Sequence, residues 1–127
     1  MSDPPLSKLR ALSIRQPYAS AIFHANPEKR KRIEHRTWST NYRGRLFIQS
    51  SLKIDWEARS DLWPDDVFTE LPVGCILGHI NLVDVVEAGP KNFHWMLGSP
   101  VLLPRPVPCG GKLGMWFVPW MAAGALP

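Results

Sequence analysis

The sequence predicts a mostly β fold with flanking helices (α+β), built as a small, partly open β-barrel with one or two helices on its side. Three observations support this fold class. The 127 residues suffice for one domain with its own core. Five or so short segments carry strand patterns, and one early segment carries a helical pattern. Strands and helices do not alternate along the chain, which argues against a doubly wound parallel sheet.

Prolines set the N-terminal elements. Residues 1–9 contain two prolines and little that could pack, so we expect a flexible tail there. The segment "ALSIRQP" predicts a strand that stops at Gln16, because a residue before proline avoids helical geometry. Pro17 then suits the first turn of a helix that Pro27 ends. The apolar stripe of this helix consists of Tyr18, Ala19, Ile22 and Phe23.

Two strands and a second helix are expected next. "RIEHRTW" predicts an extended segment that points Glu34, Arg36 and Trp38 to one side. "NYRG" turns the chain, and "RLFIQSS" predicts a strand whose alternate residues face opposite sides. "KIDWEARSDLW" has a helical pattern, and we expect Trp56 and Trp63 to seal that helix onto the core.

The C-terminal half contains the longest strand candidate, "GCILGHINLVDVVEA", in which Gly74 and Gly78 mark places where a barrel strand bends. "NFHWML" is interpreted as a single helical turn. "PVLLPRPVPCGGK" holds too many prolines for a central strand, so it is expected at an edge or as a crossing segment. "LGMWFV" predicts the last strand, with Trp116 in the core. The folded domain is expected over residues 10–120, followed by a C-terminal tail over residues 121–127.

The charge of the chain is unevenly distributed. Its formal net charge is +4 and its pI about 9.4. Residues 1–50 carry ten Lys or Arg against three acids, a balance of +7, whereas residues 51–127 carry five against eight, a balance of −3. Such asymmetry indicates a surface for nucleic acid or another polyanion.

Cysteine and histidine spacing gives no sign of a metal site or cofactor. Cys75 and Cys109 form no CxxC pair, and the four histidines show no zinc spacing. The N-terminus lacks the apolar core of a secretory signal, so we expect a cytoplasmic protein with reduced thiols. The longest apolar stretch is interrupted by polar residues, so no membrane partner is expected.

Five segments in the expected order carry a family resemblance: "LSIRQPYASAI", "KRIEHRTW", "YRGRLFIQSS", "LPVGCILGHINLVDVV" and "PVPCGGKLGMWFV". Together they resemble the ASCH domain, a member of the PUA-like superfamily of small β-barrels. The family hallmark GxKxxExR is matched at Lys31, Glu34 and Arg36, while Lys29 stands in place of the glycine. Gln49 stands where the family commonly has histidine.

The resemblance implies a basic cleft beside the barrel that binds RNA or a nucleotide-like ligand, with DNA as a further possible partner. Two alternatives stay open. One is a hydrolase acting on RNA or on a modified cytidine such as N4-acetylcytidine, with Lys31 and Glu34 as its catalytic residues. In the N4-acetylcytidine branch the catalytic threonine aligns with Glu34, so the nucleophile is absent. The other alternative is a protein-interaction adaptor in transcription or RNA metabolism.

The residues themselves support a site in the basic segment. Glu34 and Arg36, two apart on a strand, can form an ion pair, which serves equally as a structural clasp or as part of a site. Lys31 has no partner at strand spacing, so it is a candidate phosphate ligand or proton acceptor. Trp38 either stacks a base, for about 1–3 kcal/mol, or packs in the core. The full set of candidate binding residues is Lys31, Arg36, Trp38, Arg15, Gln16, Tyr42, Arg43, Lys29, Arg30 and Arg32.

Overall fold

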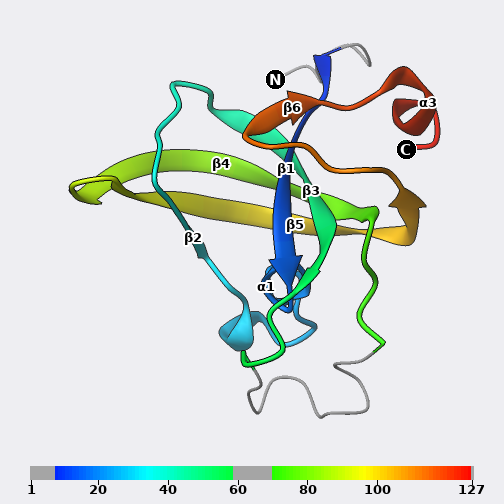
Figure 1. Ribbon diagram of the computed structural model, residues 1–127, viewed down its shortest axis with the longest axis horizontal. Helices are drawn as coiled ribbons and strands as arrows, with labels where there is room; N and C mark the ends of the chain where they lie inside the picture. The colour runs from blue at the N-terminus through cyan, green and yellow to red at the C-terminus, as the bar shows by residue number, and fades with distance from the viewer. Residues whose placement is uncertain (1–7, 59–69, 127) are drawn as a thin grey trace.

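The computed structural model describes residues 8–58 and 70–126 of the chain (Figure 1). Its elements in chain order are β1 (Arg10–Gln16), α1 (Tyr18–Ala21), the 3₁₀ turn η2 (Pro27–Lys29), β2 (Ile33–Arg36), β3 (Gly44–Ile54), β4 (Cys75–Gly89), β5 (Asn92–Pro108), β6 (Met115–Phe117) and α3 (Trp120–Ala123). The prediction of a mostly β fold with minor helices is therefore confirmed.

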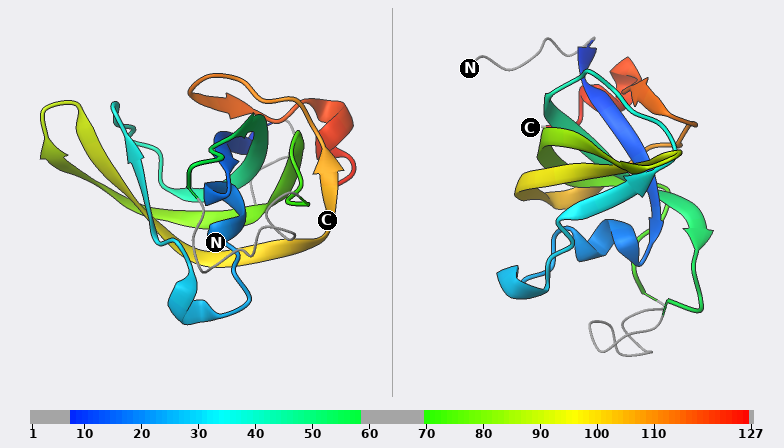
Figure 2. Two further views of the ribbon diagram at one scale, coloured as in Figure 1. Left: turned by 60° about the horizontal axis from the view of Figure 1, so that its bottom comes forward. Right: turned by 90° about the vertical axis from the view of Figure 1, so that its left-hand side faces the viewer.

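The strands form one six-stranded sheet in the order β2-β5-β4-β3-β1-β6. β1 and β3 run parallel, and every other neighbouring pair is antiparallel. β4 and β5 make a long curved hairpin, and the whole sheet is strongly curved, with one concave face (Figure 2). The edge strands β2 and β6 do not pair with each other, so the sheet does not close into the expected barrel.

The open side of the sheet lies between β1 and β2. β6 pairs only with Arg10–Leu12, so residues 13–16 of β1 have no strand on that edge within the described residues. Arg36 of β2 crosses the gap and donates a hydrogen bond from Nη2 to the Ser13 carbonyl at 2.7 Å. We call this gap between residues 13–16 and β2 the seam.

Both faces of β3 are buried from Leu46 to Ser50, because the sheet separates two hydrophobic cores. Leu46 and Ile48 belong to a first core on the concave side, together with Leu12, Leu82 and Trp95. Phe47 belongs to a second core on the other face, and the predicted alternation of this strand is confirmed. The second core also contains Leu9, Ala11, Ile76, Leu103, Val107, Cys109, Trp116, Val118, Ala123 and Leu126.

The chain after β6 packs onto this second core. Trp116 is buried, as predicted. The segment 121–127 was expected to be a tail, but over its described residues it includes the end of α3, with Ala123 and Leu126 buried. Through Ala123 and Leu126, this short segment covers Ala11 of β1 and Phe47 of β3 in the second core. Residues 1–7 of the expected N-terminal tail lie outside the described residues.

Two helical predictions differ from the structure. The supposed helical turn "NFHWML" is the start of β5, because these residues pair with β2 on one side and with β4 on the other. The pattern "KIDWEARSDLW" was wrong where it can be followed: Lys53 and Ile54 end β3, and a turn follows. Trp56 follows the end of β3 and is half exposed, so it does not seal a helix onto the core as predicted, while Trp63 lies outside the described residues.

The predicted helix after Pro17 is only four residues long in α-helical form, followed by a turn and η2. Its apolar side chains Ala19, Ile22 and Phe23 are buried, as the stripe predicted. This short piece turns the chain from β1 toward β2 and thereby brings the basic residues 29–32 to one end of the seam.

Gly78 lies where β4 approaches β5 closely, and the proline-rich segment lies at an edge of the sheet, as predicted. A Cβ atom on Gly78 would lie 2.2 Å from the Val101 carbonyl oxygen, so only glycine lets β4 and β5 approach there. The β4–β5 register shifts beside it, between Ile76 and Gly78. Beyond Met96, β4 is the only described strand that pairs with β5, so the prolines of β5 stand on an edge of the described sheet.

Candidate nucleotide-binding cleft

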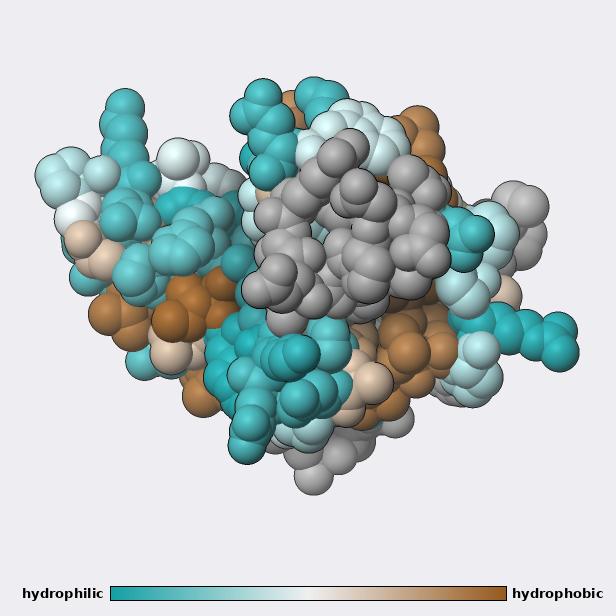
Figure 3. Space-filling model, turned by 90° about the horizontal axis from the view of Figure 1, so that it is seen from below, coloured by the Kyte–Doolittle hydropathy of each residue, from teal (hydrophilic) through white to brown (hydrophobic). Residues whose placement is uncertain are grey.

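A cleft of about 370 Å³ lies in the seam. Its walls come from the end of β1, from α1, from the basic loop (residues 29–32) and from β2. The lining residues are Ile14, Arg15, Tyr18, Lys31, Glu34, His35 and Arg36. Seen from below, the molecule shows patches of hydrophilic side chains with apolar ones between them (Figure 3). The hallmark triad thus lines a concave site, as expected from the sequence.

Glu34 is the centre of an ion-pair network. Its Oε1 lies 3.3 Å from Lys31 Nζ, and its Oε2 lies 2.9 Å from Arg36 Nη2. The carboxylate is buried, whereas the side chains of Lys31 and Arg36 keep 18% and 22% of their surface exposed. The alternation of β2 turns Glu34 and Arg36 to the same side, and Lys31 reaches Glu34 from the loop. Lys31 therefore has the partner that strand spacing did not predict.

Backbone hydrogen bonds fix the loop that carries Lys31. The Lys31 N–H donates to the Ala21 carbonyl at 3.0 Å, and the Leu97 N–H donates to the Arg32 carbonyl at 2.9 Å. α1 and β5 therefore hold the loop from both sides. The amine of Lys31 consequently starts from a defined backbone position at the wall of the cleft.

The other basic residues of the loop are partly used to shape it. Arg30 Nε donates to the His24 carbonyl, and Arg32 Nη2 donates to the Pro27 carbonyl, both at 2.8 Å. Lys29 and Arg32 are exposed. These three residues lie beside the cleft rather than in its lining, so they contribute positive charge at its border.

Tyr18 was not predicted as a site residue, yet its ring lines the cleft. Its hydroxyl donates to Asp55 Oδ2 at 2.6 Å, and Lys31 Nζ lies 5.8 Å from the ring centroid. The hydrogen bond to Asp55, with burial as a second cause, raises the pKa of Tyr18. The same bond lowers the pKa of Asp55. The signal that could have found Tyr18 is its place directly after the Gln-Pro that ends β1.

Arg15 is the most accessible cation of the cleft. It comes from the end of β1, is exposed, and makes no ion pair within the described residues. Ile14 provides an apolar part of the lining next to it. His35 lines the opposite wall, where β2 borders the seam.

Gln16 does not line the cleft, although it was predicted to read a base. Its side chain is fully buried, and Nε2 donates to Ser20 Oγ and to the Pro72 carbonyl, each at 2.7 Å. Its Oε1 accepts from the Ser20 N–H at 2.9 Å. The amide is fully used in joining β1 to α1 and to the segment before β4, because a buried amide must be paired.

Trp38 and Tyr42 pack rather than face the cleft. The Trp38 ring meets Trp95 edge to face at 4.8 Å, and the Trp38 carbonyl accepts from Trp95 Nε1 at 3.2 Å. Tyr42 lies under the Arg10 guanidinium, whose carbon is 4.6 Å from the ring centroid. The Tyr42 hydroxyl donates to the Arg45 carbonyl. Burial raises the pKa of Tyr42.

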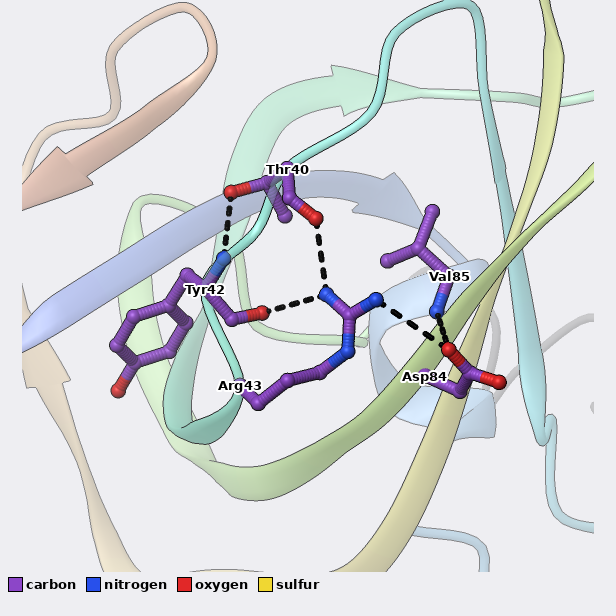
Figure 4. Close-up of polar contacts among 5 residues, drawn as sticks. All are labelled: Thr40, Tyr42, Arg43, Asp84 and Val85. Atoms are coloured by element: carbon purple, nitrogen blue, oxygen red, sulfur yellow. Dashed lines mark hydrogen bonds and ion pairs between the residues drawn. The ribbon is translucent and has the colours of Figure 1, made fainter.

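Arg43 was also expected to bind ligand, but it holds the turn before β3 (Figure 4). Its Nη1 donates to the carbonyls of Thr40 and Tyr42, and its Nη2 lies 3.3 Å from Asp84 Oδ1. Asp84 also accepts from the Val85 N–H. Arg43 therefore joins the turn to β4 and is not among the residues of the cleft.

Within the described residues, no group of three or more His, Cys, Asp and Glu side chains is arranged to hold a metal ion. None of the helices in this part of the chain is long and apolar enough to cross a bilayer.

Comparison with known families agrees with the resemblance seen in the sequence. A family model for the ASCH domain matches residues 12–102, which include the hallmark residues and every residue that lines the cleft. A search of curated proteins finds no match. Because the family model covers most of the chain, this protein belongs to the ASCH domain family.

Proposed function

We propose that this ASCH domain binds a nucleotide unit of RNA in the seam cleft. The observation that carries the proposal is that Arg15, Lys31 and Arg36 line one concave site together with a tyrosine ring and a single carboxylate. The volume of about 370 Å³ falls within the range of about 300–1,000 Å³ that is typical of small-ligand pockets. A cleft of this size suits one nucleotide of a single strand better than a duplex.

The charges of the cleft suit a phosphate at its mouth. Arg15 is exposed and makes no ion pair within the described residues, so its guanidinium is available to an anion. Lys31 and Arg36 share one carboxylate, Glu34, which leaves an excess of positive charge in the lining. The exposed cations of the basic loop would add sequence-independent attraction for the neighbouring phosphates.

The base would lie against Tyr18. The hydrogen bond from its hydroxyl to Asp55 fixes the ring, which lowers the entropic cost of using the ring as a stacking surface. Aromatic stacking of one base contributes about 1–3 kcal/mol and tolerates any base. Tyr18 thus takes the stacking role that the sequence had assigned to Trp38, since the Trp38 ring is used in core packing.

The hydrolase alternative receives less support from the lining. Among the described residues that line the cleft there is no Ser, Thr or Cys to act as a nucleophile. Lys31 is held in an ion pair with Glu34, so its amine already has a carboxylate partner and is not free to act as a proton acceptor. An adaptor role would use the same basic border to dock an acidic protein partner.

Salt dependence of RNA binding tests the proposal. We expect the affinity of the full chain for a fluorescent single-stranded RNA, measured by anisotropy, to fall linearly with salt on logarithmic axes. Lys31→Gln should weaken binding and lower the magnitude of the slope by about one. Lys91→Gln, which removes the same charge at the exposed β4–β5 turn, is the matched control and should behave as the wild type.

Two results would contradict the proposal. One is RNA binding that Lys31→Gln and Lys91→Gln weaken equally, which would indicate attraction by overall charge alone. The other is turnover of RNA or of N4-acetylcytidine that is lost in Lys31→Gln, which would establish the hydrolase alternative. Binding of an acidic protein in place of RNA would favour the adaptor.

A further inference from the structure

The register of β2 and β5 brings together two histidines that are far apart in the sequence. His35 on β2 lies directly opposite His94 on β5, and the ring centroids are 4.6 Å apart. Histidine spacing along the chain gave no sign of a metal site, because strand pairing, not sequence proximity, creates this contact. The rings meet edge to face with an interplanar angle of 83°.

The separation of the rings fits two ligands of one metal ion. Metal–nitrogen bonds of about 2.0–2.1 Å, with roughly 1.2 Å from nitrogen to ring centre, place the centroids about 4.5–5.2 Å apart for N–metal–N angles of roughly 90–110°. The observed 4.6 Å lies in this range without any shift of the backbone. Rotation about the χ2 torsions, which are broad for histidine, changes the direction of both ring nitrogens while leaving the ring centres almost in place.

Both imidazoles are available as ligands. Within residues 8–58 and 70–126, neither ring takes part in a hydrogen bond or an ion pair. His35 is exposed and His94 half buried, and the next residue in their row is the exposed Val86 on β4. A metal ion can therefore reach the pair from solvent, and water can complete its coordination.

We propose that His35 and His94 form a two-imidazole site for a divalent transition-metal ion, such as Zn²⁺ or Cu²⁺. Neutral imidazole is a ligand that these ions prefer, and Cu²⁺ leads the affinity order for such sites. No third His, Cys, Asp or Glu side chain joins the pair among the described residues. The ion consequently keeps open positions, and its affinity is moderate compared with that of a closed structural zinc site.

The proposed metal site lies beside the cleft, because one of its two histidines belongs to both. His35 is also a lining residue of the cleft, next to Glu34 and Arg36 on β2. An ion held by His35 and His94 would lie on the other side of β2 from the Glu34 and Arg36 side chains, so it would add positive charge near the cleft without occupying it. The metal site itself does not depend on the RNA-binding proposal, because its ligands belong to β2 and β5 alone.

Copper binding to the full chain, prepared without a histidine tag, tests the site. Titration with Cu²⁺ followed by electron paramagnetic resonance should show one bound ion coupled to two imidazole nitrogens. His35→Gln and His94→Gln should each remove one of these couplings and weaken binding by about tenfold or more, because even partners outside the ligand shell change metal affinity 10–100-fold. Calorimetric titration with Zn²⁺ should likewise show tighter binding to the wild type than to either variant.

His24→Gln is the matched control, because His24 lies in the turn before η2 and accepts a hydrogen bond from the Asn26 N–H. It should bind Cu²⁺ as the wild type does. His35 is exposed, so His35→Gln keeps the test valid even if His94→Gln disturbs the fold. The proposal would be overturned if His35→Gln and His94→Gln bound Cu²⁺ and Zn²⁺ as tightly as the wild type does. An electron paramagnetic resonance spectrum of the wild type without coupling to two imidazole nitrogens would also overturn it.

Discussion

At the residue scale, Glu34 holds the cleft together by facing two cations. Replacing it with glutamine keeps the shape but leaves Lys31 and Arg36 without their carboxylate. We expect Glu34→Gln to lower the free energy of unfolding by about 1–3 kcal/mol, measured by urea denaturation. Glu87→Gln, at an exposed position of β4, should change it by less than about 0.5 kcal/mol. Equal effects of the two variants would show that the network has no structural role.

The hydrogen bond between Tyr18 and Asp55 makes a pH-dependent contribution to stability. The folded pKa of Asp55 is lowered, so its contribution is complete above the unfolded value of about 3.9 and is lost as pH falls through the folded value. The folded pKa of Tyr18 is raised, so its contribution is complete below about 10 and is lost as pH rises through the folded value.

Tyr18→Phe removes this bond and tests that dependence. The stability difference between wild type and Tyr18→Phe should be constant near neutral pH and shrink as pH falls from about 5 to about 2, measured by guanidinium unfolding. Tyr42→Phe is the control, because the Tyr42 hydroxyl donates to a backbone carbonyl, which does not titrate. A difference for Tyr18→Phe that stays constant down to pH 2 would contradict the assignment.

The sequence predicted the hallmark residues of the site but not the use of their neighbours. The alternation of β2 could be predicted from the sequence, so Glu34 and Arg36 were placed on one side of the strand. The ion pair between Lys31 and Glu34 could not, because it depends on the path of the basic loop. Gln16, Trp38 and Arg43 were assigned to ligand because each has, besides any local partner, one that lies 56, 57 or 41 residues away. Such partners are set by tertiary packing, which no local pattern reports.

At the scale of elements, the close approach of β4 and β5 depends on Gly78. A Cβ atom there would meet the backbone oxygen of Val101 at 2.2 Å, and backbone cannot move aside as a flexible side chain can. We expect Gly78→Ala to lower the free energy of unfolding by about 3 kcal/mol. Gly110→Ala is the control, because nothing lies within 4 Å of its Cβ, and it should be neutral or slightly stabilising. Thermal or urea unfolding measures both, and near-wild-type stability of Gly78→Ala would refute the close approach.

β4 was predicted well, whereas the start of β5 and the helical pattern that follows β3 were not. β4 was evident because fifteen residues carry one β-rich run. "NFHWML" was misread because six residues with aromatic side chains fit a helical turn or a strand equally well, and pairing with β2 and β4 decided the outcome. The prolines of β5 were correctly placed at an edge, since a missing N–H is tolerated there.

At the scale of the whole molecule, the second core contributes no residue to the lining of the cleft. Leu103 is buried in the second core, on the sheet face opposite the first core. Leu103→Ala should lower the free energy of unfolding by about 2–5 kcal/mol. Its affinity for RNA should stay within about twofold of wild type wherever it is folded, because independent sites contribute additively.

Arg15→Ala should leave stability unchanged and weaken RNA binding, the opposite of Leu103→Ala. Its stability should stay within about 0.5 kcal/mol of wild type, because Arg15 is exposed, while its affinity for RNA falls. Arg105→Ala, on the exposed edge of β5, removes the same charge away from the cleft and should bind RNA as the wild type does. A loss of binding in Leu103→Ala equal to that in Arg15→Ala would show that the cleft and the second core are coupled.

The overall class of the molecule was readable from composition, strand spacing and the family resemblance, while the openness of the sheet was not. Whether edge strands pair depends on how β1, β2 and β6 end relative to one another, and their lengths differ by only a few residues. β6 covers three residues of β1 and leaves the rest of that edge free. The cleft exists because of that difference.

The second core draws its residues from two parts of the chain, and this determines how much of the chain the fold needs. The family match ends at residue 102, yet seven of the eleven buried residues of this core, from Leu103 to Leu126, come after that point. The chain after residue 102, which includes the second half of β5, therefore supplies most of the apolar side chains packed behind β1 and β3. Ending the chain at residue 102 should expose that face of the sheet to water and lower its tolerance of heat, although every residue that lines the cleft would remain.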